Sequence, residues 1–160
     1  MWEWVISFCQ WLESLSVPTW VRNTLWGYPY IRLIHFSGLS LWIGTIVVLD
    51  LRLLDLAGRR QTIAKVAEEL FPWTWAGFAI AVTGGVLLFS AIAATYIHNP
   101  AFQIKLPLLL LGLVYHVRIQ RKVRKWNESP STPMGAKLAG LSELVLWIAV
   151  ITAGVEIPNN

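Results

Sequence analysis

Four long apolar segments occupy most of this 160-residue chain and constrain its fold more than any other feature. A transmembrane helix needs about 20 consecutive apolar residues. Lipid offers no hydrogen-bond partner to an irregular backbone, so each segment is expected to be a helix. The segments cover about residues 24–51, 72–97, 100–118 and 137–157, and Pro29 favours a later start for the first. Their short connections predict an all-α integral membrane protein, an up-down-up-down bundle of four transmembrane helices.

The composition supports a single membrane domain over residues 1–160. Hydrophobic residues make up 56% of the chain and charged residues only 14%, which leaves too little polar surface to cover a soluble core. The net charge of +4 does not indicate a nucleic-acid partner, because the basic residues lie beside apolar segments. The single cysteine, Cys9, excludes an intrachain disulfide and a Cys-x-x-Cys-His haem attachment.

Two shorter segments are predicted to lie in the membrane interface. Within residues 1–20, apolar and polar residues separate onto two sides of a helix, which predicts an amphipathic interfacial helix. The first ten residues carry Glu3 and no basic residue, so we do not expect a secretory signal. Residues 62–70 show the same amphipathic spacing, and we expect a second interfacial helix there, separate from the second span.

The distribution of Lys and Arg predicts the orientation. Ten of the 13 Lys and Arg residues fall on the side that holds the first and third connections between spans. Cytoplasmic segments carry an excess of Lys and Arg. This side is therefore expected to be cytoplasmic, and both termini are expected on the opposite side.

Two histidines within the predicted spans are the main candidates for a functional site, because ionisable residues inside a membrane are costly. Gly38 lies three residues after His35, and Gly112 lies four before His116. These spacings place each glycine on the face of its histidine, where a missing side chain would leave a flat slot for a porphyrin. The alternative is a hydrogen-bonded histidine beside a glycine that serves close helix packing.

One haem iron could bind both histidines, because the first and third spans lie diagonally across an up-down-up-down bundle. The difference in depth between His35 and His116 is about 8 Å or about 16 Å, depending on where the spans begin. Arg32 and Arg118 could meet haem propionates, or extend to lipid headgroups. His98 is expected at the interface, and Asp50 is expected in a charged cluster with Arg52 and Asp55 at the inner interface.

Glu143 lies within the fourth span and has three possible partners. It could form an ion pair with Arg52 or Arg118, or accept a proton from His116.

The motifs resemble two groups of membrane proteins. The stretch HFSGLSLWIG, from His35 to Gly44, is similar to the first helix of copper-resistance D-type domains and related haem-binding membrane proteins. The ordered motifs LWGYP, DLRLLDL, FPWTWAGF, NPAFQIKL and YH resemble a family of small bacterial four-helix proteins. This resemblance implies a b-type haem protein of the bacterial inner membrane, ligated by His35 and His116. At Arg32 the chain departs from the pattern, in which an acidic residue is commoner.

The expected function is therefore that of a membrane b-type cytochrome with bis-histidine ligation, exchanging electrons with a quinol or a redox protein. One alternative is a haem-dependent oxidase, because the first-helix histidine also resembles the bacterial membrane protein that oxidises protoporphyrinogen. Another is a cofactor-free structural subunit. Copper transport is disfavoured, because Met1 and Met134 both lie outside the spans. Trp2, Trp4 and Trp11 favour a homo-oligomer through the N-terminal segment.

Overall fold

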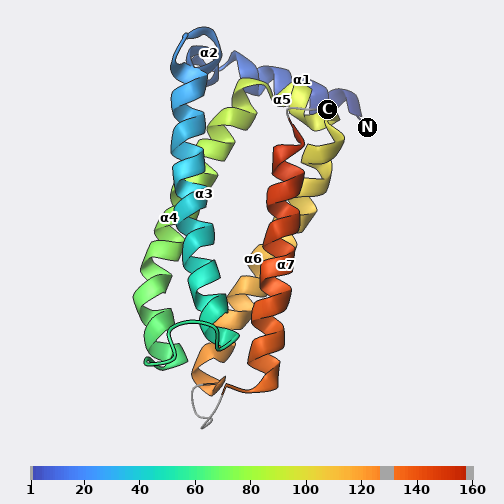
Figure 1. Ribbon diagram of the computed structural model, residues 1–160. Helices are drawn as coiled ribbons and strands as arrows, with labels where there is room; N and C mark the ends of the chain where they lie inside the picture. The colour runs from blue at the N-terminus through green and yellow to red at the C-terminus, as the bar shows by residue number, and fades with distance from the viewer. Residues whose placement is uncertain (1, 127–131, 158–160) are drawn as a thin grey trace.

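The computed structural model describes residues 2–126 and 132–157, and these residues form helices joined by short connections (Figure 1). The helices are α1 (Trp2–Ser14), α2 (Ser16–Asn23), α3 (Gly27–Leu53), α4 (Ile63–Ala91), α5 (Ala93–His98), α6 (Pro100–Trp126) and α7 (Met134–Val155). Four of them, α3, α4, α6 and α7, are long and apolar enough to cross a membrane. The prediction of an all-helical bundle with four membrane spans is confirmed.

The four spanning helices form two antiparallel pairs. α3 packs along α4, and α6 packs along α7; the pairs meet where α3 contacts α7 and where α4 contacts α6. Within the described residues no Cα atom of α3 lies within 8 Å of one of α6, so these two helices lie diagonally across the bundle. Figure 1 shows α1, α2, α5 and the C-terminus at one end, here called the terminal end. The opposite end, where residues 54–62 connect α3 to α4, is called the loop end.

The second predicted interfacial helix proves to be part of α4, which is a correction to the sequence-based boundaries. Thr62 caps α4 by accepting a hydrogen bond from the Lys65 backbone N–H, and the helix continues without a break to Ala91. Pro72 lies inside this helix. A proline interrupts one backbone hydrogen bond, but a membrane helix tolerates it because neighbouring groups satisfy the freed backbone.

The predicted interfacial segment of residues 1–20 forms two helices, because Leu15 adopts an extended conformation between α1 and α2. α1 crosses the terminal end and contacts α2, α4 and α5. Its Cys9 side chain is buried. The Glu13 carboxylate accepts a hydrogen bond of 2.7 Å from the Ala94 backbone N–H, so it caps the first turn of α5. α1 is therefore attached to the bundle as well as suited to the interface.

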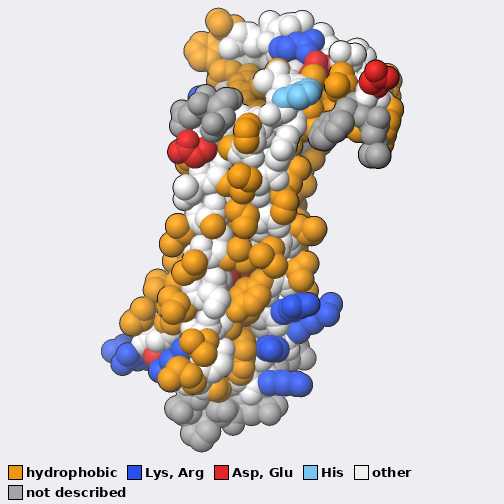
Figure 2. Space-filling model, turned by 90° about the vertical axis from the view of Figure 1, so that its right-hand side faces the viewer, with side chains coloured by type: hydrophobic (Ala, Val, Ile, Leu, Met, Phe, Trp, Pro, Cys, Tyr) orange, Lys and Arg blue, Asp and Glu red, His pale blue; other side chains and the backbone are white. Residues whose placement is uncertain are grey.

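Two apolar clusters fill the bundle. One lies toward the loop end and includes Leu49, Leu53 and Ile119. The other lies nearer the middle around Trp42, whose ring centroid is 4.6 Å from that of Trp147 and 4.9 Å from that of Phe78. Figure 2 shows apolar side chains along the length of the outer surface, with Lys and Arg gathered near the loop end. This surface suits a lipid environment.

Candidate functional site

His35 lies on α3 and is held by a carbonyl group of α4. Its Nδ1 atom is 2.6 Å from the Ala81 carbonyl oxygen. A carbonyl oxygen only accepts, so Nδ1 carries the proton and Nε2 presents a lone pair. Among the described residues Nε2 makes no hydrogen bond. The imidazole is therefore fixed in the orientation and tautomer of a metal ligand.

The glycines that adjoin His35 belong to α4. A Cβ atom on Gly84 would lie 2.9 Å from the His35 Cβ atom, and one on Gly85 would lie 3.1 Å from its Cε1 atom. Gly38 faces the same part of α4, because its Cβ atom would lie 2.5 Å from the Ala81 backbone nitrogen. Gly38 thus allows α3 and α4 to pack closely, while the adjacent Gly84 and Gly85 make room for the imidazole.

Lys105 is a second polar side chain near His35 that sequence reasoning left out of the site. It lies on α6, is half-buried, and interacts electrostatically with His35. A Cβ atom on Gly154 of α7 would lie 3.2 Å from its Nζ atom. No carboxylate of residues 2–126 or 132–157 pairs with Lys105. Arg32, by contrast, is exposed on α3.

His116 lies in a different environment, between α6, α4 and α7. It is only 1% exposed, and the rings of Phe71 and Trp75 on α4 flank it. Its Nδ1 atom is 2.7 Å from Oε1 of Glu143, and its Nε2 atom is 2.9 Å from the Gln120 amide nitrogen. Both ring nitrogens are thus engaged by protein groups.

The structure does not bring His35 and His116 together. His35 lies eight residues after α3 begins at Gly27, whereas His116 lies sixteen residues after α6 begins at Pro100. At 1.5 Å per residue this difference corresponds to about 12 Å in depth. The ring of Trp147 adjoins Gly112, where an added Cβ atom would lie 3.2 Å from it. This ring packs on Trp42 in a layer between the two histidines.

Glu143 and Asp50 complete the surroundings of His116, and neither side chain is exposed. Oε1 of Glu143 also accepts a hydrogen bond of 3.2 Å from the Trp147 indole N–H. The Asp50 carboxyl group faces that of Glu143. Of the three partners considered for Glu143, His116 is the one that it contacts.

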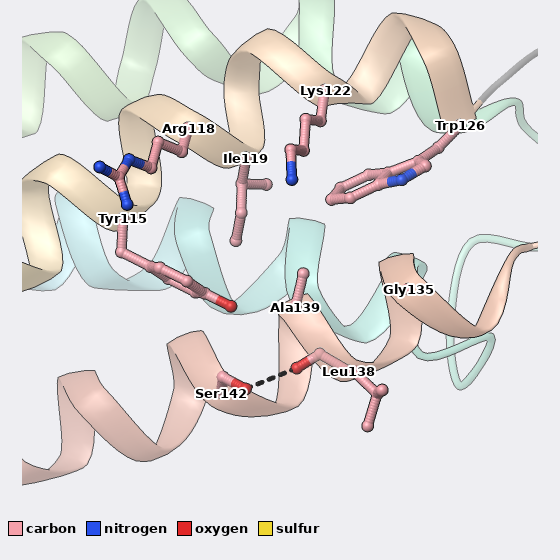
Figure 3. A pocket seen from close by; sticks show the side chains of 9 residues that line it. All are labelled: Tyr115, Arg118, Ile119, Lys122, Trp126, Gly135, Leu138, Ala139 and Ser142. Carbon is pink, nitrogen blue, oxygen red and sulfur yellow. Dashed lines mark hydrogen bonds between the residues drawn. The ribbon is translucent and has the colours of Figure 1, made fainter.

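The arginines considered as partners of Glu143 are used elsewhere. Arg52 forms an ion pair of 3.0 Å with Asp55 and donates to the Gln61 carbonyl oxygen. Asp50 is not in this interfacial cluster, which corrects the sequence-based expectation. Arg118 lines a surface groove between α6 and α7 together with Tyr115 and Lys122 (Figure 3).

The remaining candidate, His98, ends α5 and is exposed, as expected for an interfacial residue; its Nδ1 atom is 2.8 Å from the Ala94 carbonyl oxygen. Within residues 2–126 and 132–157, no three His, Cys, Asp or Glu side chains come close enough to hold a metal ion.

The four apolar helices define the chain as an all-helical, multi-pass membrane protein. It belongs to a protein family of unknown function (DUF6644), which residues 8–159 match. No curated protein and no solved structure matches the chain.

Proposed function

We propose that this chain is a membrane redox protein that binds haem b through His35. The observation that carries this proposal is the hydrogen bond of 2.6 Å between His35 Nδ1 and the Ala81 carbonyl oxygen. Metal-bound histidines generally donate their second ring N–H to such an acceptor, which orients the ring and raises the basicity of the ligating nitrogen. The free Nε2 atom of His35 is thus suited to an axial position on iron.

The surroundings of His35 fit an anionic, planar cofactor. Gly84 and Gly85 let the imidazole pack directly against the backbone of α4, which would hold the ring in place for such a cofactor. Lys105 supplies a positive charge that no carboxylate of the described residues neutralises, and a haem propionate would do so. Haem b supplies one-electron chemistry when bound. His35 would hold the haem, Ala81 would orient its imidazole, and Lys105 would balance the charge of a propionate.

His116 is left out of this haem site. Metal–nitrogen bonds are about 2 Å long, so one iron cannot bind two imidazoles that differ in depth by about 12 Å. Engagement of both its nitrogens also leaves His116 no lone pair to offer. One histidine of this chain would then hold the haem, which favours the oxidase form over the bis-histidine electron carrier.

The orientation of the protein is part of the same proposal. The loop end carries most of the Lys and Arg side chains (Figure 2), so it faces the cytoplasm. The termini and the His35 site then lie toward the outer face of a bacterial inner membrane. A quinol in the bilayer or a redox protein on that face would exchange electrons with the site.

The experiment that tests the proposal is an optical spectrum of the full-length chain, purified in mild detergent from haem-replete cells. We expect a b-type spectrum that is lost in His35→Ala and kept in His116→Gln, with exposed His98→Ala as control. A high-spin spectrum would identify the oxidase form, and a low-spin spectrum the carrier. A wild-type protein without haem, or full haem content in His35→Ala, would overturn the proposal; the first result favours the cofactor-free subunit.

A homo-oligomer built through α1 is a further part of the proposal. Trp4, Phe8 and Trp11 are 68%, 53% and 55% exposed, and they form an apolar surface on α1. Replacing the three with serine leaves the buried Cys9 in place, so the helix keeps its contact with the bundle. We expect the triple variant to lower the mass of the assembly in mild detergent. A wild-type chain that is only monomeric there refutes this part.

A further inference from the structure

A second polar cluster lies between the loop end and the packed rings of Trp42, Phe78 and Trp147. The proposed haem site does not use this cluster. It consists of Asp50 from α3, His116 and Gln120 from α6, and Glu143 from α7. Asp50 and Glu143 are 0% exposed and His116 is 1% exposed. Groups that ionise inside a membrane are costly, and they mark ion pathways and proton relays.

The hydrogen bonds define the protonation state of His116. The Gln120 amide nitrogen can only donate, so the ring nitrogen Nε2, 2.9 Å away, must accept. His116 is therefore neutral and carries its proton on Nδ1. That proton is donated to Oε1 of Glu143 over 2.7 Å, and the Trp147 indole N–H donates to the same oxygen, so Oε1 itself carries no proton.

One of the two facing carboxyl groups then has to carry a proton, either on Asp50 or on Oε2 of Glu143. Neither carboxyl oxygen of Asp50 has a hydrogen-bond partner among the described residues, and neither does Oε2 of Glu143. Two adjacent buried carboxyl groups cannot both ionise, because like charges at short range repel strongly. A proton on Asp50 can be donated to the facing Glu143 carboxylate, which satisfies both groups. The cluster in this state holds one carboxyl proton and a single negative charge.

We propose that Asp50, Glu143 and His116 form a buried proton-binding site, which takes up a second proton on His116. Protonation at Nε2 converts the imidazole to imidazolium and makes the cluster neutral, which a low-dielectric interior favours. The Gln120 amide must then rotate by half a turn to present its carbonyl oxygen to the new N–H. Gln120 is therefore the group that moves when the proton arrives.

The proton exchanges with the loop end. Asp50 lies three residues before α3 ends at Leu53, and Gln120 lies one helical turn beyond His116 in the same direction. On the opposite side, the packed rings of Trp42, Phe78 and Trp147 separate the cluster from His35. The cluster thus lies nearer to the loop end, and we expect its proton to exchange with that side of the membrane.

The surrounding groups favour a proton over a metal ion. α4 contributes the rings of Phe71 and Trp75, and α7 contributes the Trp147 indole, so none of them adds a charge. Arg52, the nearest cation along α3, is paired with Asp55. In the part of the chain that the structure describes, no Lys or Arg pairs with Asp50 or Glu143. The described residues also include no group of three His, Cys, Asp or Glu side chains that could hold a metal ion.

The test uses infrared and ¹⁵N magnetic resonance spectra of the full-length chain in lipid nanodiscs. At neutral pH we expect the infrared band of a protonated carboxyl group, lost in Asp50→Asn. Asparagine keeps the shape of the side chain and can donate to Glu143, so the bundle should persist. Glu143→Gln is the second variant, and Glu69→Gln, at an exposed carboxylate of α4, is the matched control.

The magnetic resonance signal of His116, identified by its loss in His116→Gln, reports the second proton. We expect an Nδ1–H imidazole at high pH and an imidazolium at low pH, with the transition shifted in Glu143→Gln. Absence of the carboxyl band, or a His116 that stays neutral wherever the protein is folded, would overturn the site. Neither readout involves haem, so repeating both in His35→Ala separates this outcome from that of the proposed function.

Discussion

His116 Nδ1 lies 2.7 Å from Oε1 of Glu143, and this contact joins α6 to α7 inside the bundle. The same Glu143 oxygen accepts the Trp147 indole N–H, and Trp147 packs on Trp42 of α3. One carboxylate therefore orients side chains on two helices and supports the aromatic layer that separates the His35 site from the loop end.

The first prediction concerns Glu143→Ala. Removing the carboxylate leaves the buried donors of His116 and Trp147 without an acceptor, and each such group costs about 1–3 kcal/mol. We expect a clearly lower melting temperature in detergent, and a smaller decrease for Glu143→Gln, which keeps an acceptor oxygen. Ser142→Ala, next in the chain and exposed, is the control. Equal stability of Glu143→Ala and Ser142→Ala would show that the contact does not stabilise the bundle.

A second prediction compares a glycine that packs against a neighbouring helix with one that has no neighbour at the Cβ position. The Cβ atom of Gly38→Ala would lie 2.5 Å from the Ala81 backbone nitrogen, so α3 and α4 must move apart. Gly44 has no atom within 4 Å of the corresponding position. We expect Gly38→Ala to lower the free energy of unfolding by about 1–3 kcal/mol and to weaken haem binding, since Ala81 also orients His35. Gly44→Ala should leave both quantities unchanged; a similar loss in both variants would contradict the packing role.

The spanning helices could be predicted from sequence, but the rotation of each helix about its axis could not. Asp50 and Arg52 are two residues apart, which places them about 200° apart around a helix. Asp50 therefore faces Glu143 inside the bundle while Arg52 reaches Asp55. Sequence reasoning grouped all three at the interface because they are close along the chain.

The His35 site shows the same limit. His35 could be singled out as an ionisable residue within a span, but its partner is a backbone carbonyl, and no side chain at Ala81 signals that role. The Gly84–Gly85 pair was a visible signal in the second span. The sequence could not show that this pair lies against His35, because that depends on how α4 packs on α3.

The third prediction concerns pH. Asp55 adopts a positive φ of 62° in the connection after α3. The Thr132 hydroxyl donates to its carboxylate, and Lys137 and Arg52 add positive charge, so the pKa of Asp55 is lowered from the ordinary value of 3.8. A lowered folded-state pKa means that the carboxylate stabilises the fold above pH 3.8, and that this contribution is lost as pH falls through the folded-state value.

Asp55→Asn tests this without straining the backbone, because asparagine tolerates a positive φ. We expect the variant to be less stable than the wild type at neutral pH and to approach it as the pH falls below 3.8. The measurement is the melting temperature as a function of pH, with exposed Glu68→Asn as control. A stability difference that does not change with pH would indicate that the charge of Asp55 is not responsible.

The last prediction concerns Lys105 and the electrostatics of the His35 site. Lys105→Met keeps the apolar stem but removes the charge that acts on His35. If the ammonium group neutralises a propionate, its loss should weaken haem retention. It should also lower the reduction potential, because a nearby positive charge favours the reduced iron. Lys105→Arg keeps the charge and should preserve both properties, and Lys65→Met removes an exposed charge at the loop end as a control. A redox titration that gives the same potential for Lys105→Met and Lys65→Met would exclude Lys105 from the site. Its role would then be that of a cation at the C-terminal end of α7, where Gly154 lies one residue before the helix ends at Val155.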